Sequence, residues 1–140
     1  VRSIGVSNYG KHHLEDMLNY ARIMPSVNQI EINPWLQRPS LISATIESGA
    51  VPMAYSPLAR GHKVRDPSLV QIANILGCTP AQVAIKWCID SGAITIPKSS
   101  NHDRILENFH SQNIDITPVM EQLQSMDENY VSGWDPTVEI

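Results

Sequence analysis

Four short segments of this chain have the hydrophobic pattern of buried β-strands. Each is rich in β-branched or other apolar residues, and glycine or proline marks its flanks. These predicted strands cover residues 1–6, 27–32, 51–55 and 93–96. Between them the spacing of apolar residues becomes helical, which indicates alternating strands and helices.

Two amphipathic segments carry apolar residues at positions i, i+3, i+4 and i+7, which lie on one face of a helix. They are Leu14, Met17, Leu18 and Ala21 in the first segment, and Leu69, Ile72, Ala73 and Leu76 in the second. The second helix is predicted to begin after Asp66, an N-cap residue followed by a first-turn proline, and to end at Gly77.

Four further helices are predicted from local signals. A helix opened by Thr79 and Pro80 runs through residue 89, and because it is apolar on nearly every face we expect it to be deeply packed. Another covers residues 41–48. A third begins near Ser100, which forms a capping pair with Asp103. The last starts at Thr117, and residues 129–140 are expected to form a loop.

The regular alternation of strand and helix predicts an α/β fold with parallel strands and right-handed crossovers. Such units form either a small doubly wound sheet or part of a (βα)8 TIM barrel. Four strands are too few to close a barrel, which needs eight at the usual tilt and shear. Residues 1–140 are therefore predicted to form a single incomplete domain of βα units with an extra C-terminal helix.

Composition narrows the classes of function. The chain has 140 residues, and 10 basic against 14 acidic residues give a net charge of −4, which disfavours binding to nucleic acid or to a membrane surface. Its apolar runs are far shorter than the roughly 18 residues of a spanning helix. Cys78 and Cys88 cannot build a disulfide framework, and the histidines lack the spacing of a metal site. With no secretory leader, we expect a cytoplasmic protein without a metal.

Polar residues lie near or just after the carboxyl end of each predicted strand. In parallel α/β proteins the chemistry lies at the carboxyl ends of the strands, so these positions would share one rim. Taken alone, any one of them is better explained as a helix cap or a turn residue, but their coincidence at four strand ends makes that explanation less adequate and favours a binding site. The residues are Ser7 and Asn8, Gln29 and Glu31, Tyr55 and Ser56, and Lys98, Ser99 and Ser100.

The loop after the fourth predicted strand has the features of an anion site. Lys98 and Ser99 precede a predicted helix, whose free N–H groups and dipole favour an anion, and Arg104 lies one turn inside it. Arg104 could clamp a phosphate with two hydrogen bonds. The alternative is a capped surface helix in which Arg104 contacts Glu107 or Asn108.

Tyr55 and the second strand offer two further candidates. The Tyr55 ring, at a strand end, could stack on a planar cofactor, although packing in the core or at the rim is the commoner fate of a single tyrosine. Gln29 and Glu31 alternate with apolar neighbours, so we expect one of them to point into a barrel interior, where a ligand amide would satisfy it.

These loops resemble those of the aldo-keto reductases. The motifs occur in the family's order and near its spacing over nearly the whole chain, and they correspond to the second half of the family's (βα)8 barrel, from about the fifth strand onward. They are Gly5-Val6-Ser7-Asn8-Tyr9, Val27-Asn28-Gln29-Ile30-Glu31, Tyr55-Ser56-Pro57-Leu58-Ala59-Arg60-Gly61, and Ile96-Pro97-Lys98-Ser99-Ser100 with Arg104, Glu107 and Asn108.

The resemblance implies a cofactor, NADP(H), and a role for each loop. The nicotinamide carboxamide would bind Ser7, Asn8 and Gln29, and the nicotinamide ring would stack on Tyr55. The diphosphate would lie against Ser56, Leu58, Arg60 and Gly61. The 2′-phosphate would be held by Lys98, Ser99 and Arg104, with Ser100 beside them, and the adenine would face Glu107 and Asn108. NADPH carries this 2′-phosphate and NADH does not, and without it the cations Lys98 and Arg104 would have no phosphate to pair with. The resemblance therefore favours NADPH over NADH.

The resemblance also implies a reaction, the reduction of a small aldehyde or ketone by hydride transfer. The family's acid tyrosine and the lysine, aspartate and histidine that tune it belong to the first half of the barrel and have no counterpart here, so we expect no activity from this chain alone. Trp35 and Trp134, with Tyr130, are the candidates for the substrate pocket.

Three hypotheses follow. The chain is the C-terminal part of an NADPH-dependent carbonyl reductase, whose N-terminal half is missing here. Alternatively, it is a non-catalytic half-barrel that pairs with itself or with another half, because open sheet edges and an uncovered apolar face favour association. In the third hypothesis it is a scaffold that binds no cofactor.

Overall fold

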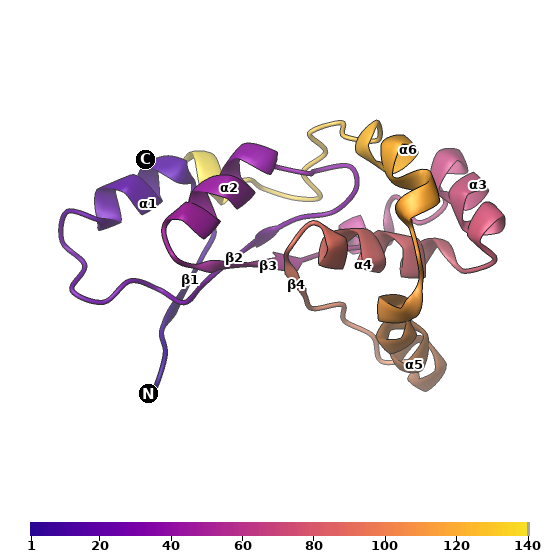
Figure 1. Ribbon diagram of the computed structural model, residues 1–140, viewed down its shortest axis with the longest axis horizontal. Coiled ribbons are helices and arrows are strands. Elements are labelled where there is room, and N and C mark those ends of the chain that lie inside the picture. Colours follow the sequence, from indigo (N-terminus) through magenta and orange to yellow (C-terminus); the bar gives the residue numbers. More distant parts are fainter. Residues whose placement is uncertain (140) are drawn as a thin grey trace.

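The computed structural model describes residues 1–139 and contains one sheet of four parallel strands in the order β1-β2-β3-β4. The strands are β1 (Gly5–Ser7), β2 (Val27–Glu31), β3 (Val51–Tyr55) and β4 (Ile94–Thr95). The helices are α1 (Lys11–Met17), α2 (Pro39–Glu47), α3 (Pro67–Leu76), α4 (Pro80–Asp90), α5 (His102–His110) and α6 (Met120–Gln124). Strand order follows chain order, as in one segment of a barrel wall (Figure 1).

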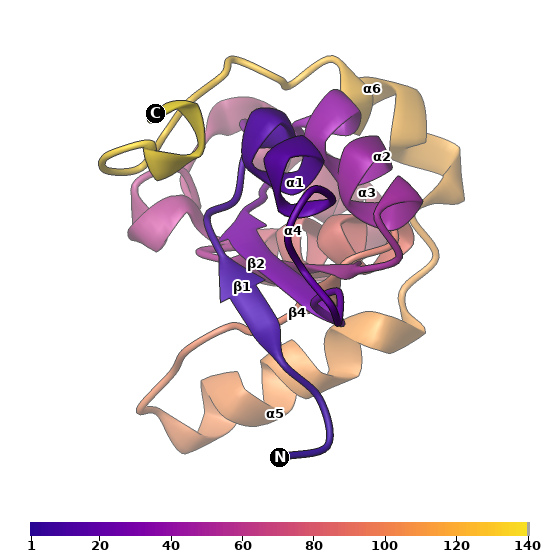
Figure 2. The same ribbon diagram turned by 90° about the vertical axis from the view of Figure 1, so that its left-hand side faces the viewer.

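The two faces of the sheet differ in what covers them. Ile30 and Ala54, whose side chains point toward the helical layer, are fully buried. On the opposite face Val51 is 42% exposed and Ile94 45% exposed. Figure 2 shows α5 on that other side, away from α1, α2 and α6. The hydrophobic core therefore lies between one face of the sheet and the main helical layer, while the other face is open.

The helix α4 is the centre of this core, as its apolar pattern predicts. Val83, Ala84 and Cys88 are completely buried, and Trp87 is nearly so. Leu69 of α3 and Leu123 of α6 belong to the same cluster. Among residues 1–139 no single helix is long and apolar enough to cross a membrane; α3 and α4 together pass by length and composition but are bent by 87° at their break.

The predicted boundaries hold best where a capping signal is local. Asp66 accepts hydrogen bonds from the amides of Ser68 and Leu69 at the start of α3, and Gly77 ends that helix with a left-handed φ of 66°. The segment 51–55 is a strand as predicted. In contrast, β1 is shorter than the predicted 1–6, and β4 shorter than 93–96.

Two predicted helix starts need correction. The N-cap of α5 is Asn101, not Ser100, because the Asn101 side chain accepts the amide hydrogen of Arg104 at 3.0 Å. The helix predicted from Thr117 is divided into a 3₁₀ turn (Thr117–Val119) and α6, since the backbone of Val119 departs from helical geometry with φ −120°. The tail forms a loop with one further 3₁₀ turn, Pro136–Val138.

Candidate cofactor-binding site

A cleft of about 360 Å³ lies between the loop after β3, the start of α4 and the helix α5. It brings together residues that are far apart in the sequence. The predicted cofactor residues in its wall are Leu58, Gly61, Lys98, Ser99, Arg104, Glu107 and Asn108. The wall also contains Val64, Thr79, Pro80 and Ala81, whose sequence pattern does not point to this site.

The cationic side of this cleft is formed by Lys98 and Arg104. Both residues are exposed, and within residues 1–139 neither side chain makes an ion pair or a hydrogen bond. The alternative contact of Arg104 with Glu107 or Asn108 is therefore not formed. Two cations without anionic partners beside the first turn of a helix suit a phosphate group.

The opposite side of the cleft is fixed by Glu107. Its carboxylate accepts a hydrogen bond from the Thr79 hydroxyl at 2.5 Å, and its backbone carbonyl accepts one from the Gln82 side chain at 3.2 Å. These bonds tie the start of α4 to the middle of α5. The sequence identified Thr79 only as a helix cap, because no local signal relates it to a residue 28 positions later.

A second group of predicted residues meets at the carboxyl ends of β1, β2 and β3. The Tyr55 hydroxyl donates to the Asn8 side-chain oxygen at 3.0 Å, and the Ser7 hydroxyl donates to the Gln29 carbonyl at 3.0 Å. The Gln29 amide lies 3.3 Å from the sulfur of Met53. Burial, and next the negative charge of Glu31, raise the pKa of Tyr55. This phenol therefore stays protonated at neutral pH and acts as a hydrogen-bond donor.

The loop that follows Tyr55 has an unusual backbone. Ser56, Ala59 and Arg60 have positive φ angles of 49°, 45° and 54°, although none of them is glycine. Left-handed conformations in non-glycine residues are costly and concentrate at functional sites. The Arg60 guanidinium lies against Gly133, where an added Cβ would come within 2.8 Å of it, so Arg60 contacts the C-terminal tail rather than the cleft.

The C-terminal tail crosses the strand ends and is anchored at several points (Figure 1). The Trp35 carbonyl accepts the amide hydrogens of Glu128 at 3.1 Å and Tyr130 at 2.9 Å. Farther along, Arg38 forms an ion pair with Asp135 at 2.9 Å. Although burial alone would raise the pKa of Asp135, hydrogen bonds from Arg38 and Thr137 hold it below its usual value.

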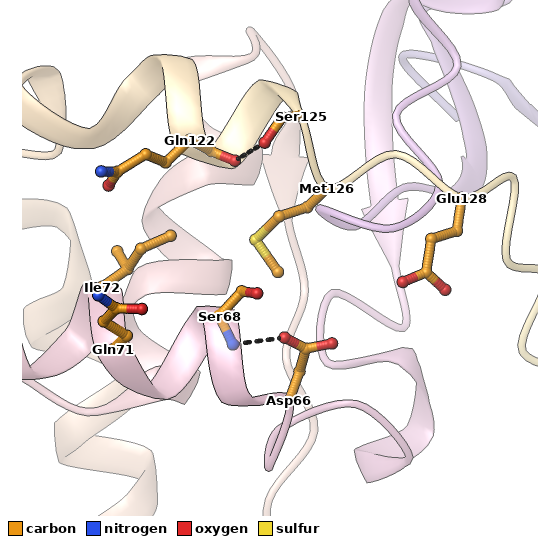
Figure 3. Close-up of a pocket in the computed structure, with 8 residues that line it drawn as sticks. All are labelled: Asp66, Ser68, Gln71, Ile72, Gln122, Ser125, Met126 and Glu128. Atoms are coloured by element: carbon orange, nitrogen blue, oxygen red, sulfur yellow. Dashed lines mark hydrogen bonds between the residues drawn. The ribbon is translucent and has the colours of Figure 1, made fainter.

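A second hollow, of about 330 Å³, lies between α3 and α6 (Figure 3). Its charged lining residues are the carboxylates of Asp66 and Glu128. Asp66 accepts hydrogen bonds from backbone amides at the start of α3, and Glu128 forms an ion pair with Lys63 at 2.6 Å. An acidic lining is unsuited to a phosphorylated ligand, which favours the cleft with Lys98 and Arg104 as the binding site.

Comparison with known proteins decides the family. The profile of the Aldo/keto reductase family matches residues 1–130. The chain belongs to this family. The resemblance seen in the sequence motifs is thereby confirmed.

The chain spans about half the length of the curated relatives that it matches. An uncharacterized oxidoreductase of Schizosaccharomyces pombe is 38% identical over 140 residues, which are 99% of this chain and 51% of that protein. Aldose reductase B of Dictyostelium discoideum is 40% identical over 132 residues, 92% of this chain and 42% of that protein.

Solved aldo-keto reductases share the fold. An enzyme from a Medee basin deep-sea metagenome library matches with a TM-score of 0.89 and 30% identity, over 100% of this chain and 53% of that one. A Bombyx mori aldo-keto reductase in complex with NADP matches with a TM-score of 0.84 and 30% identity, over 95% of this chain and 47% of that one. The predicted fold, parallel βα units from a (βα)8 barrel, is confirmed.

The two tryptophans proposed for a substrate pocket lie in different environments. Trp35 is completely buried in the core, so its expected place in a pocket wall needs correction: its contribution to the rim is its backbone carbonyl. Trp134 is 69% exposed, and its indole N–H donates to Glu139 at 3.1 Å. Trp134 therefore remains the candidate for contact with a substrate.

Proposed function

We propose that this aldo-keto reductase chain is the cofactor-binding half of a cytoplasmic, NADPH-dependent oxidoreductase that reduces small aldehydes or ketones to alcohols. The observation that carries the proposal is the cleft in which Lys98 and Arg104, both without an anionic partner in residues 1–139, face the Glu107 side. The silkworm relative in complex with NADP supports the choice of cofactor.

The residues present fit the two ends of such a dinucleotide. Lys98, Ser99 and Arg104 would hold the 2′-phosphate, and the adenine would lie along Glu107 and Asn108. Leu58 and Gly61, which line the same cleft, would run beside the diphosphate together with the Ser56 turn. When bound, the cofactor would supply the hydride for carbonyl reduction.

The nicotinamide end would lie over the strand-end group. Ser7, Asn8 and Gln29 provide the hydroxyl and amide groups that a carboxamide needs, and Tyr55 provides a half-buried ring for stacking. The Tyr55 hydroxyl is hydrogen-bonded to the Asn8 side chain, which limits the positions of the ring before a ligand arrives. This arrangement supports binding and orientation rather than proton transfer by Tyr55.

Catalysis would need groups beyond these. The acid tyrosine of the family and its lysine, aspartate and histidine partners correspond to the first half of the barrel, whereas this chain resembles the second half. We therefore propose that the chain alone does not reduce carbonyls. Aldehyde-dependent oxidation of NADPH above background by the purified chain would contradict this point.

Titration of the chain with NADPH and NADH, followed by tryptophan fluorescence and calorimetry, tests the cofactor proposal. We expect NADPH to bind more tightly, and Arg104→Ala to weaken NADPH about tenfold, because a charge-assisted hydrogen bond to phosphate is lost, while NADH binding changes little. Lys11→Ala, at an exposed lysine of α1, is the matched control. Equal affinities for both cofactors, in the wild type and in the Arg104 variant, would contradict the proposal.

Self-association is a second candidate function, and one specific observation favours it. The helix α5 has no buried residue, and its apolar side chains Ile105, Leu106 and Phe109 are 50%, 48% and 65% exposed. Ile105 and Phe109 line the same hollow as Ile94 of the open sheet face, and exposed apolar surface of this kind marks an interaction site. Two copies would together supply the eight parallel strands that close a barrel.

Light scattering coupled to size exclusion distinguishes this second candidate. We expect a dimer at micromolar concentration if the α5 face binds a second copy, and dissociation on introducing a charge there. A monomer with a cooperative melting transition would contradict it. The same face would also fit the first four βα units of a family barrel, and addition of that half would then form a one-to-one complex.

A further inference from the structure

The proposed function leaves one buried charged group without a role, the carboxylate of Glu31. Glu31 ends β2, is only 2% exposed and lies on the same face of the strand as Gln29. Burial of an ionised carboxylate is expensive unless other groups compensate it. A group of this kind beside a binding site therefore calls for an explanation.

The partners of Glu31 are all neutral. Each of its two oxygens accepts the backbone N–H of Ser132 at 3.3 Å, and one also accepts from the Asn33 side-chain amide at 3.5 Å. Within residues 1–139 Glu31 forms no ion pair. Its negative charge is thus held in place by weak, neutral hydrogen bonds, and its field extends to neighbouring groups.

Tyr55 is the residue of the neighbouring strand that lies directly beside Glu31. The β2–β3 register pairs Glu31 with Tyr55, and neighbouring strands lie about 4.8 Å apart. After burial, Glu31 has the largest influence on the Tyr55 pKa and raises it. Arg38 and Arg60 act in the opposite direction, but Asp135 opposes them and forms an ion pair with Arg38 at 2.9 Å. Among the charged groups, Glu31 therefore has the largest effect on the pKa of Tyr55.

We propose that Glu31 sets the relative affinity of this site for the two redox forms of the cofactor and favours the oxidised form. The inference rests on the proposed function, which places the nicotinamide ring on Tyr55. The oxidised ring is a pyridinium with a positive charge, whereas the reduced ring is neutral. A fixed negative charge in a poorly solvated place therefore stabilises NADP⁺ selectively, and NADPH gains little from it.

The direct test is the substitution Glu31→Gln, which removes the charge but keeps the size of the side chain and an oxygen for the Ser132 amide. Dissociation constants for NADP⁺ and NADPH are measured on the same preparations by fluorescence and calorimetry. We expect the Kd of NADP⁺ to rise about tenfold, as Coulomb's law gives for a charge several ångströms away at an intermediate effective dielectric. The Kd of NADPH should stay within about twofold. Glu121→Gln, at an exposed glutamate of α6, is the matched control and should change neither constant.

For a second variant we expect a shift of opposite sign in the ratio of the NADP⁺ and NADPH dissociation constants. This test does not require that Glu31→Gln folds. Arg38→Gln leaves Asp135 without its cation, makes the surroundings of Tyr55 more negative and should bind NADP⁺ more tightly relative to NADPH. Opposite shifts in the two variants support the inference, and if Glu31→Gln does not fold, the lack of any shift in Arg38→Gln still overturns it. Equal weakening of both cofactors, or an unchanged ratio, overturns it and assigns Glu31 a purely structural role.

The outcomes also separate this inference from the proposed function. If the wild-type chain binds neither NADP⁺ nor NADPH, the proposed function fails and the inference fails with it. If the wild-type chain binds both and the ratio does not respond to Glu31 or Arg38, only the inference fails.

Discussion

The carboxyl ends of β1, β2 and β3, here called the rim, differ from the helix α5 in how many partners their side chains have within the chain. At the rim, buried polar groups are bonded across long sequence distances, as between Glu31 and Ser132, and the tail is fixed by Trp35 and Arg38. The helix α5 has no buried residue and exposes Phe109. Contacts within the chain therefore determine the geometry of the rim, whereas few such contacts hold the apolar face of α5.

This difference matters because the cleft proposed to bind the cofactor lies between the two regions. One wall, with Leu58 and Gly61, belongs to the strained loop beside the rim, and the other belongs to α5. The Thr79–Glu107 hydrogen bond is one of the links that join α5 to the core. We expect the nicotinamide end of the site to be preorganised and the adenine end to depend on how firmly α5 is held.

The prediction with the largest expected effect on stability compares the loss of one aromatic side chain from each region. Trp35→Ala should lower the free energy of unfolding by about 3 to 5 kcal/mol, because it leaves a large cavity in the core under the tail. Phe109→Ala should change it by less than about 0.5 kcal/mol, since that ring is largely in solvent. Urea denaturation of both variants measures the difference. Similar losses would show that α5 is packed as firmly as the rim.

The second prediction concerns the pH dependence of the tail anchor. Because the pKa of Asp135 is lowered in the folded chain, its ion pair with Arg38 contributes stability above the ordinary carboxyl pKa, and this is lost as pH falls through the lowered value. Asp135→Asn should cost about 1 to 2 kcal/mol at pH 7 and less at pH 3. Denaturation midpoints from pH 2 to pH 7 test this. A cost that does not vary with pH would contradict the assignment.

The third prediction removes the same kind of helix cap in each region. Asp66→Ala at α3 and Asn101→Ala at α5 each remove a side-chain acceptor worth about 1 kcal/mol. Because α3 buries Leu69 in the core, the first loss should lower global stability, whereas the second should only increase local opening of α5. Hydrogen exchange of α5 amides together with global denaturation distinguishes the two. A global loss from Asn101→Ala would mean that α5 unfolds with the core.

The sequence predicts the parts of the fold and site whose signals are local. The caps Asp66 and Thr79, the end at Gly77 and the strand 51–55 depend on residues only a few positions apart. The α5 cap is wrong by one position, because Ser100 and Asn101 are adjacent residues that can both cap a helix, and only backbone geometry selects one of them.

The long-range parts could not be predicted in this way. Glu31 and Ser132 are 101 positions apart, and Thr79 and Glu107 are 28 apart, so no local pattern relates them. Trp35 follows a polar strand end, and a tryptophan at such a position can face either the rim or the core. Leu58, Gly61, Lys98 and Ser99 of the predicted set nevertheless line one cleft, because the loops that carry them follow parallel strands, which end at one edge of the sheet.

The variant with the smallest expected effect on stability is also the most direct test of the open face. Phe109→Glu places a charge in the middle of the exposed apolar side of α5, beside Ile105. Since Phe109 is already 65% exposed, the free energy of unfolding should change by less than about 0.5 kcal/mol. A self-associating chain should nevertheless become monomeric, because a buried, unpaired carboxylate opposes the contact. The control is Glu121→Gln on α6, which should leave assembly unchanged. Persistence of the dimer in Phe109→Glu would show that copies meet elsewhere, and the open face of α5 would then need a different partner.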